Sequence, residues 1–198
     1  VHADGMVAHF LTTATITCDN FVRGLNAMLP GAIKVFNAEE ALASFHARFS
    51  AIGKEYQYEI YTGKIQPPRL RLYSLHVTCS LDLDAISKCL ATITGTHDFS
   101  SFENSGSRDK DLCSGRGAVR TIHTTELITN VSELLALRFS GDGFLRNMIR
   151  NLVGTLLEVG RGKITPVEFA AILAAKDRTM AGPTAPAHGL WLKKVLYS

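Results

Sequence analysis

The chain has 198 residues, of which 46% are hydrophobic and 20% are charged; this composition is typical of a globular protein and excludes a disordered or low-complexity chain. Its formal net charge of +3 is far below that of a histone-like protein, so charge alone favours a nucleic-acid partner only slightly. The longest apolar runs are also much too short to span a bilayer, and the sequence therefore predicts no membrane partner.

The first part of the chain predicts a helix between two strands. Alternating side chains over residues 6–12 predict the first strand, and residues 32–38 predict the second. Residues 19–31 have the apolar spacing of a helix, with Asp19 as its N-cap and Pro30 as part of its stop.

The middle of the chain predicts two further strands and one helix. In residues 55–63, EYQYEIYTG, tyrosine and isoleucine alternate with glutamate and glutamine, which predicts a strand with two distinct faces. A proline-broken loop follows over residues 64–71, and residues 73–79 predict a strand. Residues 81–95 predict a helix that stops at Gly95.

The last part of the chain begins with a long loop rich in serine, glycine and charge. We then expect strands over residues 118–129 and 133–143, helices over 144–159 and 166–175, and a final strand over 189–197. Helices and strands alternate with strands in excess, so the predicted fold class is α+β with a largely antiparallel sheet.

Cysteine and histidine spacing does not indicate a metal site. The four cysteines form no C-x-x-C pair and no histidine lies at zinc-finger spacing from them, so we interpret them as reduced thiols. Glycine spacing of the P-loop type is also absent from the sequence. His97 and Asp98 are neighbours whose side chains point apart in most backbones, and Asp98 is predicted to pin a turn.

The helix predicted over residues 144–159 carries positive charge without a neighbouring acid. Arg146 and Arg150 are four residues apart on the side opposite the apolar stripe, with Asn147 and Asn151 beside them. This pattern suits a site that receives a carboxylate or phosphate from elsewhere. An ordinary exposed arginine pair is an equal alternative.

The segment FHARFSAIGKEYQY combines basic and aromatic side chains. It contains Arg48, Lys54, Tyr56 and Tyr58. Nucleic-acid bases that are single-stranded or flipped out of a helix are bound by such a combination, because basic side chains neutralise the phosphates and aromatic rings stack on the bases. By spacing alone, the favoured alternative is a strand that buries one tyrosine face in the core.

Residues 175–192, AKDRTMAGPTAPAHGLWL, have few side chains to bury. Small residues and two prolines follow a short charged run, between the predicted last helix and last strand. The composition fits either an open surface loop or an ordered loop of a site, and it does not separate the two.

Five stretches of the chain together resemble the TruA family of tRNA pseudouridine synthases. They run in order over nearly the whole chain, and the last two are highly specific: FHARFSAIGKEYQYEIY, GTHDFSSF, VRTI, GFLRNMIRNLVGTLLEVGRGK and AKDRTMAGPTAPAHGLWL. The resemblance implies the pseudouridine synthase fold, an α+β catalytic domain with a large mixed, mainly antiparallel sheet flanked by helices. It also implies that residues 1–41 are the remainder of an N-terminal α/β subdomain and residues 42–198 a C-terminal one.

The resemblance further implies an activity and partners. Members of this family isomerise uridine to pseudouridine in the anticodon stem-loop of tRNA, at positions 38–40, and work as homodimers without metal or cofactor. We therefore expect tRNA and a second copy of the chain as partners, and a cytoplasmic location, with an organellar one as the alternative.

The opening segment VHADGMVAHF resembles part of the family motif R-T-D-x-G-V-H-A, from its valine onward. By this resemblance the nucleophilic aspartate is expected three residues before Val1, and Asp4 is a different residue. The chain as given would then be inactive alone. A non-catalytic RNA-binding module, or a folding or assembly fragment without activity, are the alternatives.

Family resemblance also assigns roles to side chains within the chain. Tyr56 matches the active-site tyrosine that stacks on uracil and helps to remove the C5 proton, and Arg150 matches the arginine that pairs with the nucleophilic aspartate. Phe144 and Leu145 are expected to line the uracil pocket. The candidate contacts to the tRNA backbone are basic: Arg48, Lys54, Arg108, Arg120 and Arg178.

Overall fold

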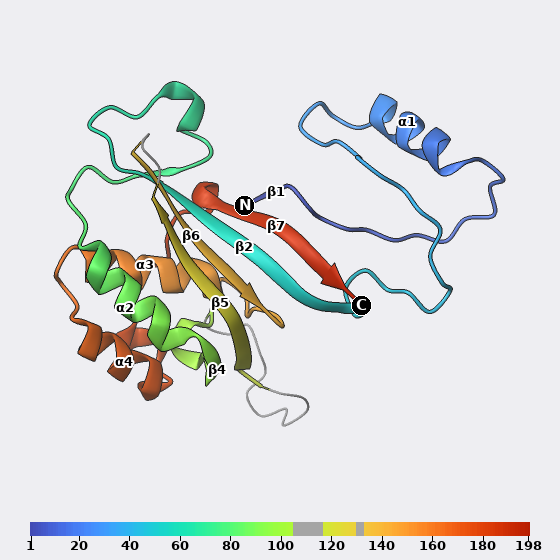
Figure 1. The fold of residues 1–198 in the computed structure, drawn as a ribbon. Helices are drawn as coiled ribbons and strands as arrows, with labels where there is room; N and C mark the ends of the chain where they lie inside the picture. The colour runs from blue at the N-terminus through green and yellow to red at the C-terminus, as the bar shows by residue number, and fades with distance from the viewer. Residues whose placement is uncertain (105–116, 130–132) are drawn as a thin grey trace. The chain divides into compact units, whose positions relative to one another are not determined.

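The computed structural model describes residues 1–104, 117–129 and 133–198 of the chain (Figure 1). It divides into two compact units, one of Val1–Met6 with Ile52–Ser198 and one of Val7–Ala51. We describe each unit by itself. The subdomain boundary expected between residues 41 and 42 is a different division of the chain and stays a prediction.

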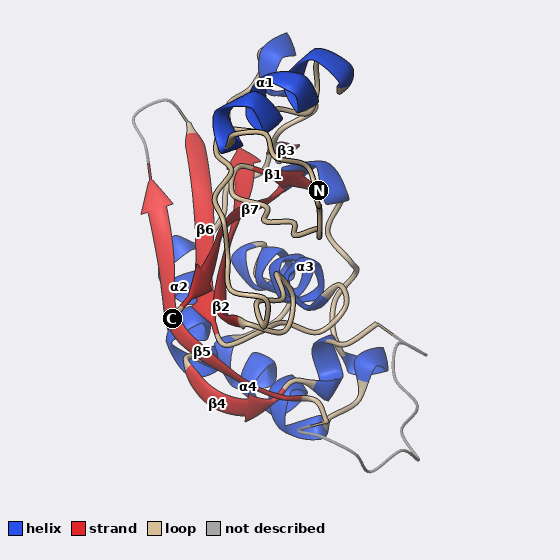
Figure 2. Ribbon diagram, turned by 90° about the vertical axis from the view of Figure 1, so that its right-hand side faces the viewer, coloured by secondary structure: helices blue, strands red, loops and turns tan. Residues whose placement is uncertain are grey.

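The larger unit is built on a mixed sheet that has seven strands within the described residues. The strand order is β1-β7-β2-β6-β5-β4, and β3 pairs with β2 beside this path. Pairing is antiparallel for β2 with β6, β6 with β5 and β5 with β4, and parallel for β1 with β7 and β2 with β3. Figure 2 shows β5 and β6 side by side. The strands are β1 (His2–Ala3), β2 (Ala51–Tyr61), β3 (Leu75–His76), β4 (Gly95–Asp98), β5 (Val119–Thr129), β6 (Leu134–Gly141) and β7 (Leu190–Tyr197).

Strand β2 has the two faces that its alternating sequence predicts. Tyr58 and Ile60 point into the core and are fully buried, opposite Leu137 and Leu135 of β6. The other face of β2 is polar, and there the guanidinium of Arg138 lies near the carboxylate and amide side chains of the strand. The alternation of side chains along β2 therefore determines which of its residues lie on the face that the helices cover, where a site can form.

The helices observed are four α-helices and four short 3₁₀ helices in the described part of the chain. Helices α2, α3 and α4 pack against one another in one layer of the larger unit (Figure 1), so the structure confirms the α+β class with a mainly antiparallel sheet. Their bounds are α1 (Cys18–Met28), α2 (Leu83–Ile93), α3 (Met148–Gly160), α4 (Pro166–Ala175), η1 (Pro68–Leu70), η2 (Ser100–Phe102), η3 (Arg178–Met180) and η4 (Ala187–Gly189).

Helix α3 begins later than the sequence predicts. Expected from residue 144, it starts at Met148, because Asn147 has a left-handed backbone with φ of 61° and such a residue does not continue a right-handed helix. The helix is then buried on nearly all sides. Asn151, which we expected on a polar face, is fully buried.

The two strands predicted over residues 6–12 and 32–38 are wrong, because the described backbone has no strand ladder there. An extended segment becomes a strand only when a neighbouring backbone accepts and donates its hydrogen bonds. At Val35 the side chain of Asn26 does this instead, since it bonds both the N–H and the carbonyl of Val35 at 2.8 Å.

Helix α1 forms close to its predicted place but with a different cap. The hydroxyl of Thr17 accepts a hydrogen bond from the N–H of Asn20, so Thr17 and not Asp19 is the N-cap. The helix ends at Met28, two residues before Pro30, as the restricted backbone of the residue before a proline requires.

Candidate active site

Tyr56 lies in β2, on the face that turns toward the core, and its register partner in β6 is Phe139. Its half-buried ring meets the ring of Phe144 edge to face, with centroids 5.3 Å apart and planes at 90°. Phe144 can lie against the sheet because Gly141 has no side chain: an added Cβ would come within 3.1 Å of Phe144 and 2.6 Å of the Thr121 carbonyl oxygen. The two rings form one wall of a candidate base-binding site.

Burial moves the titration of the Tyr56 and Tyr58 hydroxyls further above neutral pH. Loss of water raises the pKa of both phenols, and at Tyr58 the nearby Arg150 cation offsets only part of that rise. Tyr58 is fully buried and its hydroxyl donates to the carbonyl of Pro186 at 2.8 Å. Tyr56 is therefore the one of these two tyrosines that a ligand can reach.

Arg150 lies in the first turn of α3 and is held by neutral acceptors. Its Nε–H donates to the carbonyl of Ala185 at 2.7 Å, and Nη1 donates to the Asn147 side-chain oxygen at 3.1 Å. No carboxylate of the described residues forms an ion pair with it. A guanidinium carries five N–H donors, so those that remain can receive an anion.

The loop that follows α4 is ordered against α3 by Arg178. Nη1 of Arg178 donates to the carbonyls of Ala181 and Gly182 at 3.3 and 3.1 Å, and Nη2 donates to the side-chain oxygens of Asn151 and Thr184, both at 3.2 Å. This part of the chain is therefore ordered by hydrogen bonds although many of its residues are exposed, and its expected place in a site stays a prediction. The expected contact of Arg178 with tRNA stays a prediction. Its guanidinium already makes hydrogen bonds within its own loop.

Two glycines allow this loop to press against α3. A Cβ on Gly154 would collide with the carbonyl oxygen of Pro183, and a Cβ on Gly182 would lie 2.9 Å from Cα of Thr155. The Ala185 N–H then donates to the carbonyl of Arg150 at 3.0 Å. Backbone and side chain of Arg150 are therefore both fixed by the same loop residue.

The structure brings several of the predicted site residues together on one side of the sheet. Phe144 touches Tyr56, and Leu145 is buried in the adjoining core. Lys54 shares the strand face of Tyr56 by its two-residue spacing and is half-buried. Tyr58 of β2 and Arg150 of α3 bond the neighbouring carbonyls of Pro186 and Ala185, so the same loop connects the start of α3 with the strand that carries Tyr56.

The remaining predicted tRNA contacts belong to other parts of the chain. Arg48 belongs to the smaller unit, where it is exposed and lies over the ring of Phe49 at 5.9 Å. Arg120 in β5 donates to the carbonyls of Gly117 and Val119. Arg108 lies outside the described residues.

Sequence reasoning missed Thr184 and the role of Asn151. Asn151 is a polar residue in an otherwise apolar helix. It follows Arg150 in the sequence, but the sequence does not indicate that its side chain is buried. Thr184 lies in a stretch of small residues whose composition left its structure open. The contact between them joins residues far apart in sequence, so no local pattern could predict it.

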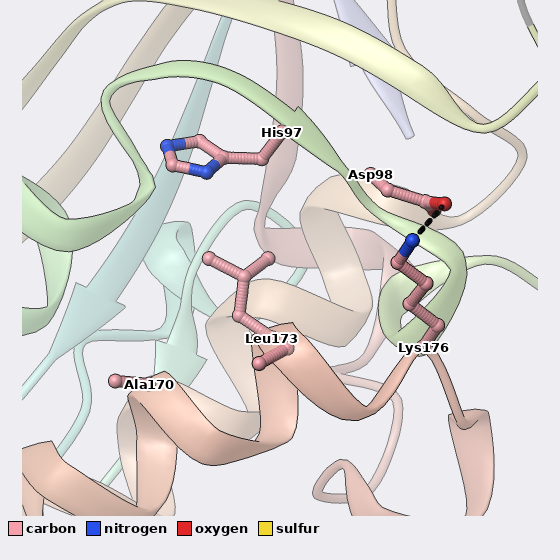
Figure 3. Close-up of a pocket in the computed structure, with 6 residues that line it drawn as sticks. His97, Asp98, Ala170, Leu173 and Lys176 are labelled. Carbon is pink, nitrogen blue, oxygen red and sulfur yellow. Dashed lines mark ion pairs between the residues drawn. The ribbon is translucent and has the colours of Figure 1, made fainter.

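A shallow pocket of about 190 Å³ lies elsewhere, between β4 and α4 (Figure 3). His97, Asp98, Leu173 and Lys176 line it, and the ammonium of Lys176 lies 3.4 Å from the carboxylate of Asp98. Asp98 also accepts hydrogen bonds from the N–H and hydroxyl of Ser100 at 3.0 and 2.6 Å, which confirms that it pins a turn. The pocket is separate from Tyr56 and Arg150, neither of which lines it.

The described part of the chain has neither a cluster of metal-ligand side chains nor a helix suited to a membrane. No group of three or more histidine, cysteine or acidic side chains there converges on a possible metal position. None of the helices described has both the length and the apolar character needed to cross a membrane.

Comparison with known proteins gives one family. The family model for tRNA pseudouridine synthases matches residues 90–198. "tRNA pseudouridine synthase A 1" of Desulfotalea psychrophila is 55% identical over 197 residues, which is 100% of this chain and 78% of the relative. "tRNA pseudouridine synthase A" of Bacillus pumilus is 46% identical, and that of Geobacter sulfurreducens 45%; the matches cover this whole chain and 77% and 78% of the relatives.

These matches and the geometry agree. The chain belongs to the tRNA pseudouridine synthase family, as its sequence motifs indicate. The assignment of Arg150 and Tyr56 to the family's arginine and tyrosine positions stays a prediction; the structure places Tyr56 in β2 and Arg150 in the first turn of α3.

Proposed function

We propose that the protein isomerises uridine to pseudouridine in tRNA, and that Tyr56 and Arg150 belong to its active site. The relatives named above are called tRNA pseudouridine synthases, and their similarity covers the whole length of this chain. The observation that carries the proposal is Arg150, a cation oriented by two neutral oxygens and without an acidic partner in the described residues. A charge held in this way is suited to an anion that another part of the assembly supplies.

The anion we propose for Arg150 is the carboxylate of the nucleophilic aspartate. A nearby guanidinium favours the ionised form of an acid, and its donors fix the orientation of the carboxylate. The aspartate would then attack C1′ and form a C1′–O bond as the N1–C1′ glycosidic bond of uridine breaks. The uracil turns, C5 attacks C1′ and displaces the carboxylate, the hydrogen on C5 leaves as a proton, and N1 takes up a proton.

The proposed task of Tyr56 is to stack on the turning base and to assist at C5. Its ring is partly exposed and is held edge-on by Phe144, so its free face can receive a flat base. Since burial raises its pKa, its hydroxyl is neutral and can relay the C5 proton only by accepting it while donating its own. Leu145 and Lys54 complete the proposed surroundings of the base and its phosphates.

The finer parts of the proposal concern the uridines, the assembly and the compartment. We propose the anticodon stem-loop at positions 38–40 as the target, and a homodimer as the working form; both rest on the family resemblance. A cytoplasmic location is supported by the cysteines at positions 18, 79 and 89, which are free thiols as a reducing compartment favours.

The test is tritium release from tRNA that carries [5-³H]uridine, using the protein produced from its complete gene. Formation of the C5–C1′ bond expels the C5 hydrogen, so we expect tritium in the solvent and pseudouridine at positions 38–40 by chemical mapping. Tight binding of tRNA without tritium release would instead support a non-catalytic RNA-binding protein and overturn the proposal.

A further inference from the structure

Asn151, Arg178 and Thr184 form a hydrogen-bonded polar cluster beside Arg150, in which Asn151 is fully buried, Arg178 is partly buried and Thr184 is exposed. The side-chain oxygen of Asn151 accepts from the hydroxyl of Thr184 at 2.6 Å and from Nη2 of Arg178 at 3.2 Å. Its side-chain N–H₂ donates to the carbonyl of Phe102 at 2.8 Å. One buried amide thus links three segments: helix α3, the loop after α4 and the turn η2.

The buried amide of Asn151 has hydrogen-bond partners at both its oxygen and its nitrogen, and these favour one geometry of the cluster. Asn151 has no exposed surface, and a buried amide that loses a partner pays the cost of desolvation without compensation. A second bond from Arg178 reaches the Thr184 hydroxyl itself. Any movement of Thr184 would therefore break bonds at both the asparagine and the arginine.

Thr184 immediately precedes the residue that holds Arg150. The Ala185 carbonyl accepts from Nε of Arg150 at 2.7 Å, and the Ala185 N–H donates to the carbonyl of Arg150 at 3.0 Å. Thr184 and Ala185 share one planar peptide, so the anchoring of Thr184 restricts the Ala185 N–H that bonds the Arg150 carbonyl. This bond in turn keeps Ala185 beside Arg150, where the Ala185 carbonyl accepts from Nε of the guanidinium.

We infer that Asn151, Arg178 and Thr184 are positioning residues, which aim the Arg150 guanidinium through the Ala185 carbonyl. The inference rests on the proposed function for its effect on turnover, and on the hydrogen bonds alone for its effect on Arg150. It assigns Arg178 an internal task that the sequence did not suggest, and it gives Asn151 and Thr184 a task in the reaction although neither touches the base.

The first test compares Thr184→Val with Thr184→Ser in the protein from its complete gene. Valine keeps the shape of threonine but loses the hydroxyl, whereas serine keeps it. For Thr184→Val we expect kcat to fall about tenfold with KM within about twofold, as for the loss of one charge-assisted hydrogen bond; Thr184→Ser should restore kcat. The matched control is Ser74→Ala, which removes a buried hydroxyl that bonds the Leu70 carbonyl, away from this cluster, and should leave kcat unchanged.

A double-mutant cycle with Arg150→Lys separates positioning from general destabilisation. Lysine keeps the charge but has no Nε–H for the Ala185 carbonyl to hold. In the Arg150→Lys background, Thr184→Val should therefore lower kcat by less than about twofold. An equal tenfold loss in both backgrounds, or equal losses for Thr184→Val and Ser74→Ala, would overturn the inference.

A readout without turnover tests the same geometry. The Arg150 Nε–H resonance, assigned by its loss in Arg150→Lys, should be slow to exchange with solvent in the parent protein and fast in Thr184→Val. Slow exchange in both proteins would overturn the inference even if the enzyme is active. Absence of tritium release in the parent protein, with the exchange result as expected, would count against the proposed function and leave the positioning role supported.

Discussion

At the scale of single residues, the proposed site combines a neutral phenol with a permanent cation. Burial raises the pKa of Tyr56, whose phenol is neutral at pH 7 even without burial, and Arg150 stays charged because a guanidinium does not lose its proton in proteins. We propose the ring as the platform for a base and the cation as the partner of a carboxylate.

Replacement of Tyr56 by phenylalanine separates its two proposed tasks. Tyr56→Phe keeps the ring that stacks and removes the hydroxyl that assists at C5. We expect the tRNA dissociation constant to change less than about threefold, whereas kcat should fall about 10²-fold, the usual size of a general acid–base contribution. Filter binding and tritium release measure the two quantities, and an unchanged kcat would show that the ring alone matters.

Asp98 makes stability depend on pH in the acid range. Burial alone would raise the pKa of Asp98, but hydrogen bonds from Ser100 and the ammonium of Lys176 outweigh it and lower the pKa. A carboxyl whose pKa is lower in the folded state adds stability above its unfolded pKa of about 3.9, and this is lost as pH falls through the folded pKa. Urea unfolding should show Asp98→Asn less stable than the parent at pH 7, with the difference shrinking below about pH 4. A difference that is the same at pH 7 and pH 3 would contradict this.

At the scale of elements, the close approach of α3 and the loop after α4 builds the site. Gly154 makes this approach possible, since no side chain fits between the helix and the carbonyl of Pro183. The loop in turn supplies the carbonyl that holds Arg150. The packing at Gly154 and the orientation of Arg150 are therefore linked, because both depend on the position of this loop.

Substitution of Gly154 tests that link. Gly154→Ala should force the loop away from α3 and lower the free energy of unfolding by about 1–3 kcal/mol, as for an overpacked core, and it should also lower kcat. The matched control is Gly24→Ala in α1, where an added Cβ meets nothing within 4 Å; there helix propensity should raise stability by about 0.5–1 kcal/mol. Calorimetry and tritium release on both variants check the result, and a neutral Gly154→Ala would contradict the packing described here.

Elements with strong local signals could be predicted from the sequence, and those that depend on distant partners could not. Helix α4 has a proline at its start and a capping box between Thr165 and Glu168, and its predicted bounds are confirmed. The left-handed Asn147 and the burial of Asn151 depend on contacts with residues more than 30 positions away, so the start of α3 was placed wrongly. Tyr56 and Arg150 were assigned to the site through family motifs, and this assignment stays a prediction, whereas the description of their surroundings needed the fold.

At the scale of the whole molecule, the proposed working form is a homodimer. Several large apolar side chains within residues 7–51 are more than half exposed in the single chain, and exposed apolar side chains favour association when they gather on one surface. Light scattering of the protein from its complete gene should give twice the mass of one chain. A monomer mass together with full tRNA activity would contradict the dimer and leave the site unaffected.

The most direct test of the whole account is the turnover of Arg150→Ala on tRNA. Loss of the guanidinium should lower kcat for tritium release by about 10³-fold, the effect of removing one electrostatic group from an active site, while the dissociation constant for tRNA changes less than about threefold. Near-normal kcat in Arg150→Ala would contradict the proposed pairing of this arginine with the nucleophilic aspartate.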